Sequence, residues 1–90
     1  MIEPTYERTA QLLEAELGDE LVALDAAAGN CFGFNAVAAS VWRYLEQPRT
    51  LTELHTALLA EYDVDAEQCG QELRELLADL TEQGLVRRVA

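Results

Sequence analysis

Few side chains in this 90-residue chain are of the kinds that perform catalysis or bind metals. His55 is the only histidine, and it lies between Leu54 and Thr56, where a surface side chain is the commoner role than a general base. Cys31 and Cys69 are far apart and form no CxxC motif, so neither a zinc site nor a redox pair is indicated. Both cysteines are expected to be buried small apolar residues.

The carboxylates and glycines also form no recognisable active site. Glu14 with Glu16, and Glu72 with Glu75, are spaced as acids on a solvated face commonly are. The glycines match no phosphate-binding pattern, and the chain has no lysine. The sequence therefore predicts a protein that is not an enzyme and that uses no metal or cofactor.

Size and charge limit the other functions. Ninety residues fit one domain, residues 1–90, in which residues 1–8 are expected to be flexible. The net charge is -11, with arginine as the only basic residue type besides His55, so the average field repels nucleic acids and anionic membranes. A neutral or basic partner fits this charge, although the charge can equally serve solubility alone.

The amino terminus, Met1 to Arg8, lacks the basic and apolar regions of a signal peptide. No apolar run approaches the length needed to cross a membrane. The expected location is the cytoplasm.

Three helices are predicted in the last two thirds of the chain. Each begins after a residue that can cap a helix: Asn35, Thr50 or Asp65. Thr50 is followed by Glu53 at the spacing of a capping box. The first helix is expected to end at Gln47–Pro48, because proline disfavours the helical conformation before it.

The third helix has the clearest end. Gly84 fits the left-handed position after a helix, and Leu80 and Leu85 are spaced as the apolar pair of a Schellman motif. Residues 85–89 can follow as an extended tail or a strand.

The first third of the sequence is ambiguous. Residues Thr9 to Leu17 have high helix propensity, yet they precede Gly18 and the apolar run Leu21 to Asp25 in a pattern that suits a hairpin. We interpret the region as strand, turn, strand, turn, strand, with the third strand over Asn30 to Phe34. The predicted fold is α+β, a three-stranded antiparallel sheet packed on a three-helix bundle.

A DNA-binding winged helix is a possible reading of this order, but the charge of the third helix argues against it. Residues 65–82 hold six acidic side chains against Arg74, and a reading helix needs phosphate contacts. Recognition of a peptide is the better fit. If Asn30 to Phe34 form a sheet edge, their free backbone groups can add an extended peptide as a further strand. The alternative is that Gly33 only marks a bulge and Asn35 only caps a helix.

Leu21 to Val86 resembles the PqqD-like family, the recognition elements that bind leader segments of ribosomally made, later modified peptides. The resemblance is carried by residues in the same order and spacing along the chain: Leu24, Asp25, Gly29, Phe32, Asn35, Val41, Trp42, Leu45, Arg49, Thr50, Leu51, Glu53, Leu54, Leu59, Glu61, Tyr62, Asp63, Val64, Asp65, Leu76, Leu80, Gly84, Leu85 and Val86. It is most similar to the stand-alone members of lasso peptide pathways. Ala27 to Phe34 stand where the quinone-cofactor members usually have a Tyr-Pro-Glu-Gly stretch, and Glu46 to Arg49 replace the family's usual Asp-Gly after the first helix.

The resemblance implies a winged helix-turn-helix-like fold in which the leader docks antiparallel along the third strand, in a groove walled by the third helix. The implied peptide-binding residues are Asn30, Cys31, Phe32, Gly33, Phe34, Glu72, Leu73, Leu76, Leu77, Asp79 and Leu80. The implied partners are the precursor leader, a transglutaminase-like leader peptidase and a macrolactam synthetase. The alternatives are an adaptor for the quinone cofactor or another radical-enzyme peptide pathway, and a winged-helix DNA-binding regulator.

Overall fold

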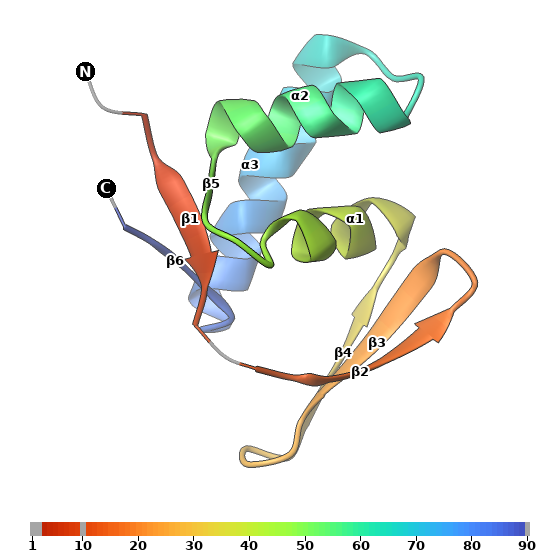
Figure 1. The fold of residues 1–90 in the computed structure, drawn as a ribbon, viewed down its shortest axis with the longest axis vertical. Coiled ribbons are helices and arrows are strands. Elements are labelled where there is room, and N and C mark those ends of the chain that lie inside the picture. Colours follow the sequence, from red (N-terminus) through yellow and green to blue (C-terminus); the bar gives the residue numbers. More distant parts are fainter. Residues whose placement is uncertain (1–2, 10, 90) are drawn as a thin grey trace.

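The computed structural model describes residues 3–9 and 11–89. Within these ranges the protein is an α+β fold of three helices and two three-stranded antiparallel sheets (Figure 1). The elements follow in the order β1 (Thr5–Arg8), β2 (Leu13–Leu17), β3 (Glu20–Asp25), β4 (Asn30–Phe34), α1 (Ala36–Tyr44), β5 (Arg49–Thr50), α2 (Leu51–Glu61), α3 (Ala66–Glu82) and β6 (Val86–Arg88).

The sheet β2-β3-β4 is the one predicted from the sequence. Its first hairpin turns at Gly18 and Asp19, with Gly18 at φ 68°, and its second turns at residues 26–29, where Gly29 has φ 73°. Both positions need the left-handed backbone that glycine adopts at little cost. Leu13–Leu17 is a strand, so tertiary pairing with β3 outweighs the helix propensity of this segment.

The second sheet was not predicted. It has the order β5-β1-β6 and joins both ends of the chain, which lie side by side in Figure 1. Thr5–Arg8, expected to be flexible, pairs with Val86–Arg88 and with the two residues Arg49–Thr50. Residues 1–2 lie outside the described part of the chain.

The predicted starts of the three helices and the end of α3 are confirmed, whereas α1 ends at Tyr44, before the predicted end at Gln47–Pro48. Asn35, Thr50 and Asp65 each accept a hydrogen bond from a backbone N–H of the first turn, and Thr50 forms the full capping box with Glu53. At the other end of α3, Gly84 has φ 77° and the N–H of Leu85 donates to the carbonyl of Leu80 at 3.0 Å, as a Schellman motif requires.

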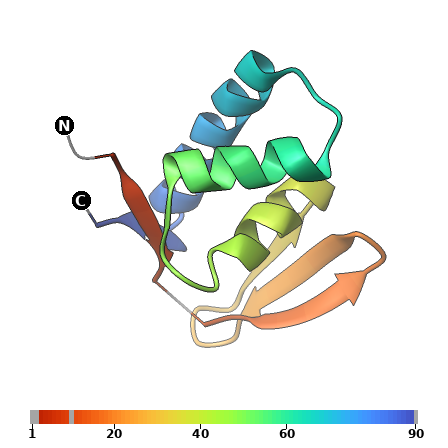
Figure 2. The same ribbon diagram turned by 45° about the horizontal axis from the view of Figure 1, so that its top comes forward.

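One hydrophobic core joins the helices to the inner face of β2-β3-β4. Trp42 of α1 is fully buried, and its ring stacks on Phe34 of β4 with centroids 5.5 Å apart. Leu21 and Ala23 of β3 face the same core. α2 and α3 cover α1 from the other side, as the two ribbon views show (Figures 1 and 2). The core therefore fixes β4 and α3 relative to each other. No helix among the described residues is long and apolar enough to span a bilayer.

Candidate functional site

The outer edge of β4 is the first feature of the candidate site. β4 pairs only with β3, so within the described chain its other side has no strand partner. The two-residue turn makes Leu17 and Glu20 a hydrogen-bonded pair, and the bonding direction alternates along β3 from there. Asn30, Phe32 and Phe34 consequently bond to β3, and the N–H and C=O groups of Cys31 and Gly33 point to the free edge.

A groove runs beside this edge, between β4 and α3. Its volume is about 360 Å³. β4 contributes its last four residues, α1 contributes its start, and α3 forms the far wall. The lining residues are Cys31, Phe32, Gly33, Phe34, Asn35, Ala38, Leu76, Asp79, Leu80 and Gln83. A strand-shaped guest on the β4 edge would therefore lie against an α3 surface that is mixed apolar and acidic.

The structure brings together most, but not all, of the residues predicted to bind a peptide. Seven of them line the groove: Cys31, Phe32, Gly33, Phe34, Leu76, Asp79 and Leu80. Asn30 is in β4 but at the hairpin end, outside the lining. Leu73 and Leu77 are each 1% exposed and belong to the core, and Glu72 lies further along α3 at a second hollow.

Three lining residues were not singled out from the sequence: Asn35, Ala38 and Gln83. Asn35 was recognised only as a helix cap, which it is, because its Oδ1 accepts from the N–H of Ala38 at 2.9 Å. Helical spacing gives the signal that was missed for Gln83, since it follows Leu76, Asp79 and Leu80 on one side of α3.

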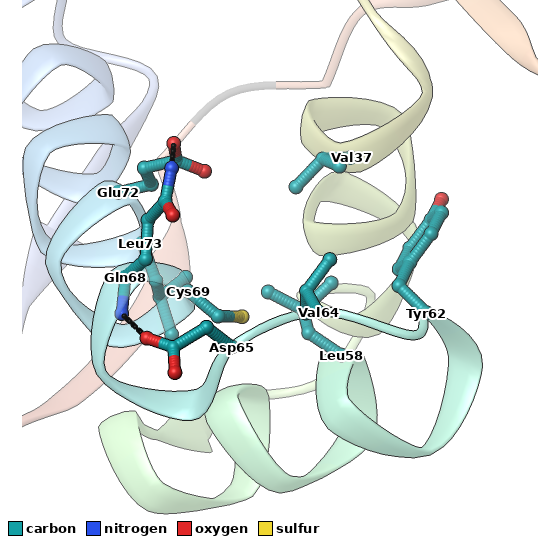
Figure 3. Close-up of a pocket in the computed structure, with 9 residues that line it drawn as sticks. All are labelled: Val37, Leu58, Tyr62, Val64, Asp65, Gln68, Cys69, Glu72 and Leu73. Atoms are coloured by element: carbon teal, nitrogen blue, oxygen red, sulfur yellow. Dashed lines mark hydrogen bonds between the residues drawn. The ribbon is translucent and has the colours of Figure 1, made fainter.

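The second hollow is a pocket of about 230 Å³ between the start of α1, the end of α2 and the start of α3 (Figure 3). Its walls are largely apolar, with Val37 on one side and Cys69 and Leu73 on the other. Val37 and Val64 are 36% and 48% exposed, which is unusual for β-branched apolar side chains lining a recess. Because Val37 precedes the groove residue Ala38, the pocket lies next to the groove.

A polar cluster fixes the helix ends that frame this pocket. The hydroxyl of Tyr62 donates to the carbonyl of Ala36 at 3.1 Å, and Ser40 Oγ donates to Glu61 at 3.0 Å. Tyr44 also donates to Glu61, and this hydrogen bond raises the pKa of Tyr44 to about 12. The end of α2 is therefore tied to the start and the middle of α1.

The two cysteines differ in their surroundings. Cys31 is exposed on the edge strand, contrary to the sequence expectation, while Cys69 is buried in the pocket wall. Burial, with a smaller effect of the Glu72 carboxylate, raises the pKa of the Cys69 thiol, so it stays protonated at neutral pH. Cys69 is thus suited to packing, not to nucleophilic chemistry.

The electrostatic character of the site is acidic. Asp79 stands on the groove wall, and Asp65 and Glu72 stand at the pocket. Asp65 is held by the N–H of Gln68, and Glu72 accepts from the Gln68 side chain at 3.2 Å. In residues 3–9 and 11–89, no group of three or more His, Cys, Asp or Glu side chains is placed to hold a metal. The site is arranged to bind an extended chain, and its rim favours basic side chains.

Comparison with known proteins gives a family and two similar structures. Residues 20–86 match the model of the family described as "Coenzyme PQQ synthesis protein D (PqqD)". No curated protein matches the chain. A solved structure described as "TbiB1 in Complex with the TbiA(beta) Leader Peptide" is 31% identical, has a TM-score of 0.79, and the match covers 93% of this chain and 98% of that one. A second, "Lasso peptide synthetase B1 complexed with the leader peptide", is 23% identical with a TM-score of 0.72, covering 91% and 96%. The second likeness is one of fold.

Proposed function

The chain belongs to the PqqD family, and on that premise we propose that it is a recognition element that binds the leader of a ribosomally made precursor peptide. The leader adds to β4 as a fourth strand of the sheet β2-β3-β4. The chain itself is not a catalyst. Its contribution to rate is to hold the precursor at high effective concentration near the enzymes that process it.

The observation that carries this proposal is the unpartnered edge of β4 beside a groove. Cys31 and Gly33 offer two N–H donors and two carbonyl acceptors there, which is the backbone pattern that strand addition uses. The 31% identical structure supports the choice of guest, because that protein is described as a complex with a leader peptide.

The expected affinity is moderate. Up to four backbone hydrogen bonds contribute about 0.5–1.5 kcal/mol each. Two or three buried apolar side chains contribute about 1.5–3 kcal/mol each. Ordering a flexible leader costs about 2–5 kcal/mol. The midpoints of these ranges leave about 6 kcal/mol, which corresponds to a dissociation constant on the order of 10 to 100 μM, so the chain can release the precursor after processing.

The pocket of Figure 3 gives the leader a second contact site next to the groove. It lies beyond the Asn35 end of β4, so a guest that continues past this end can place one apolar side chain between Val37 and Cys69. Glu72 and Asp79 would then lie near any lysine or arginine of the guest. The apolar pocket and the two acidic residues together favour a leader that alternates apolar and basic residues over a leader of uncharged polar residues.

The resemblance to lasso peptide members supports a proposal about the downstream partners. We propose that the chain delivers the precursor to a transglutaminase-like leader peptidase and to an ATP-dependent macrolactam synthetase. An adaptor for a quinone cofactor would use the same edge with a different precursor, so the pathway is decided by which leader binds.

The test is fluorescence anisotropy with the labelled leader of the precursor from the chain's own pathway. Binding with a dissociation constant on the order of 10 to 100 μM that survives an excess of a scrambled leader is the expected result. A duplex of DNA at the same ionic strength should not bind, because α3 is acidic. A chain that does not bind the leader, or that binds the scrambled peptide equally well, would refute the proposed function.

A further inference from the structure

The pairing of the arginines singles out one place on the surface. Arg74 and Arg88 form no ion pair within residues 3–9 and 11–89, although the chain has 17 acidic side chains. Both line the same hollow. The remaining arginines are each paired with a carboxylate: Arg8 with Glu14, Arg43 with Glu16, Arg49 with Glu53 and Arg87 with Glu7.

This hollow, which we call the basic hollow, lies between α3 and the sheet β5-β1-β6 and has a volume of about 400 Å³. Tyr6 and Arg88 are paired across β1 and β6, so their side chains share the face of the sheet that meets α3. Leu77 and Ala78 of α3 give the hollow an apolar floor. The full lining is Tyr6, Arg74, Leu77, Ala78, Thr81, Glu82 and Arg88.

The basic hollow has the opposite charge balance from the rest of the surface. Its lining holds two arginines against one carboxylate, that of Glu82. In the groove, the pocket of Figure 3 and two further hollows of the described chain, carboxylates equal or outnumber arginines. A guanidinium group binds a carboxylate through two parallel hydrogen bonds, and a local excess of arginine attracts acids that the net charge of -11 repels elsewhere.

The backbone next to the basic hollow can also bind an extended chain. β6 is an edge strand of its sheet in the described chain. The N–H of Val89 donates to the carbonyl of Thr5, and the N–H of Thr9 donates to the carbonyl of Leu85. Because the bonding direction alternates along a strand, the N–H and C=O groups of Arg88 point away from β1. Arg88 is exposed, so a guest chain can reach both groups.

We propose that the basic hollow binds an extended acidic segment of a second protein. Aspartate or glutamate side chains of the segment contact Arg74 and Arg88, and an apolar side chain between them packs on Leu77 and Ala78. This interaction is separate from leader binding and does not depend on it.

The basic hollow and the leader groove lie on opposite sides of α3. Successive residues of a helix are rotated by about 100°, so the α3 residues of the hollow, centred on Ala78, face away from the groove residues around Leu80. Figure 1 shows the same arrangement, with β1 and β6 on one side of α3 and β4 on the other. A chain bound at each place would therefore not compete with the other.

Charge also separates the two guests. The groove carries Asp79 and favours a basic guest, whereas the hollow favours an acidic one, so one leader segment does not suit both. A second copy of this chain is a poor occupant. Its acidic strand is β2, and the carboxylates of Glu14 and Glu16 there are already held by Trp42 and Arg43.

The experiment is a titration of the ¹⁵N-labelled chain, followed by NMR, with a synthetic peptide of four Glu–Val repeats. The amide signals of Tyr6, Ala78 and Arg88 should shift, and those of Cys31 and Gly33 should not. A peptide of four Lys–Val repeats should leave the first three signals unchanged.

Two double variants with the same change of charge locate the contact. Arg74→Gln/Arg88→Gln should lower the affinity for the Glu–Val peptide by about fivefold or more at low salt, because each exposed ion pair is worth a modest amount. Arg43→Gln/Arg49→Gln is the control, since these two arginines are also exposed but lie outside the basic hollow. It should bind the peptide within about twofold of the wild type. The spectra of both variants verify the fold.

Four results would overturn the proposal. The first is a Glu–Val peptide that causes no shifts or shifts Cys31 and Gly33 instead, and the second is an equal response to the Lys–Val peptide. The third is an equal loss of affinity in the two double variants, which would show a general effect of charge. The fourth is another occupant, seen either as a precursor peptide that shifts Arg88 by itself or as a dimer that Arg74→Gln/Arg88→Gln dissociates in light scattering.

Discussion

A proline at Gly33 tests strand addition most directly. Gly33 directs its N–H to the open edge of β4, so Gly33→Pro removes one donor for the guest and leaves the bonds to β3 in place. A Cβ built at Gly33 meets no heavy atom within 4 Å, and its φ is not in the left-handed region. A side-chain carbon is therefore tolerated at this position, and a proline there removes no hydrogen bond to β3.

The expected loss follows from the guest carbonyl that is left unpaired. Such a group costs about 1–3 kcal/mol, which is a fall in leader affinity of about 5- to 150-fold. Gly33→Ala is the matched control, because it adds a side-chain carbon in the same open space and keeps the N–H. It should bind the leader within about twofold of the wild type, since surface substitutions of this kind are nearly neutral.

Anisotropy with the labelled leader measures both variants, and circular dichroism with thermal melting verifies the fold. Equal affinity of the proline and alanine variants, with native spectra for both, would show that the β4 edge does not bond the leader. An equal loss of leader affinity in both variants would mean that the leader needs the open space next to Gly33 and not its N–H group. Either result would refute the strand-addition geometry.

Four further predictions test the site and its support. Iodoacetamide should label Cys31 quickly in the free chain, and saturating leader should slow the labelling by about tenfold or more if the edge is covered; an unchanged rate, followed by mass spectrometry, would place the leader elsewhere. Asp79→Lys should weaken a basic leader more at low than at high salt, whereas Glu67→Lys, in the first turn of α3 and outside the groove lining, should not, and equal effects of the two would exclude a local contact. Thr50→Ala should lower the free energy of unfolding by about 1 kcal/mol in urea titrations, because it removes the cap of α2. The N–H of Thr50 lowers the pKa of Glu53 below its ordinary 4.5. The stabilisation from Glu53 is therefore present above pH 4.5 and is lost as the pH falls through the pKa of the folded state. A Glu53→Gln variant whose free energy of unfolding keeps the wild-type dependence on pH in this acid range would contradict this prediction.

Local signals in the sequence were sufficient for the helices and their ends. Asn35, Thr50 and Asp65 cap the three helices as predicted, since a capping interaction involves only residues within one turn. The Leu80–Leu85 pair around Gly84 is equally local. The position of β4 at the edge of its sheet was also foreseeable, because it needs only the order of three neighbouring strands.

Contacts between distant segments were not foreseeable in this way. Arg49–Thr50 is too short to give a strand pattern, and it becomes one only because β1 lies beside it. On α3, spacing alone puts Leu73, Leu76, Leu77 and Leu80 on one apolar stripe. The crossing of α3 over the core decides that Leu73 and Leu77 are buried and that Leu76 borders the groove.

The alternation of aromatic and small residues along β4 explains both the inward packing of its phenylalanines and the free backbone groups at its edge. In a strand, the direction of the side chain and the direction of the backbone N–H and C=O groups alternate together. Phe32 and Phe34 must therefore bond to β3 if they pack inward, and the intervening Cys31 and Gly33 must then present their backbone to the edge and their side chains to the outer face. The free hydrogen-bonding groups thus belong to the two smallest residues of the strand. A guest chain can approach them closely, so the free edge and the groove beside it are consequences of a single register.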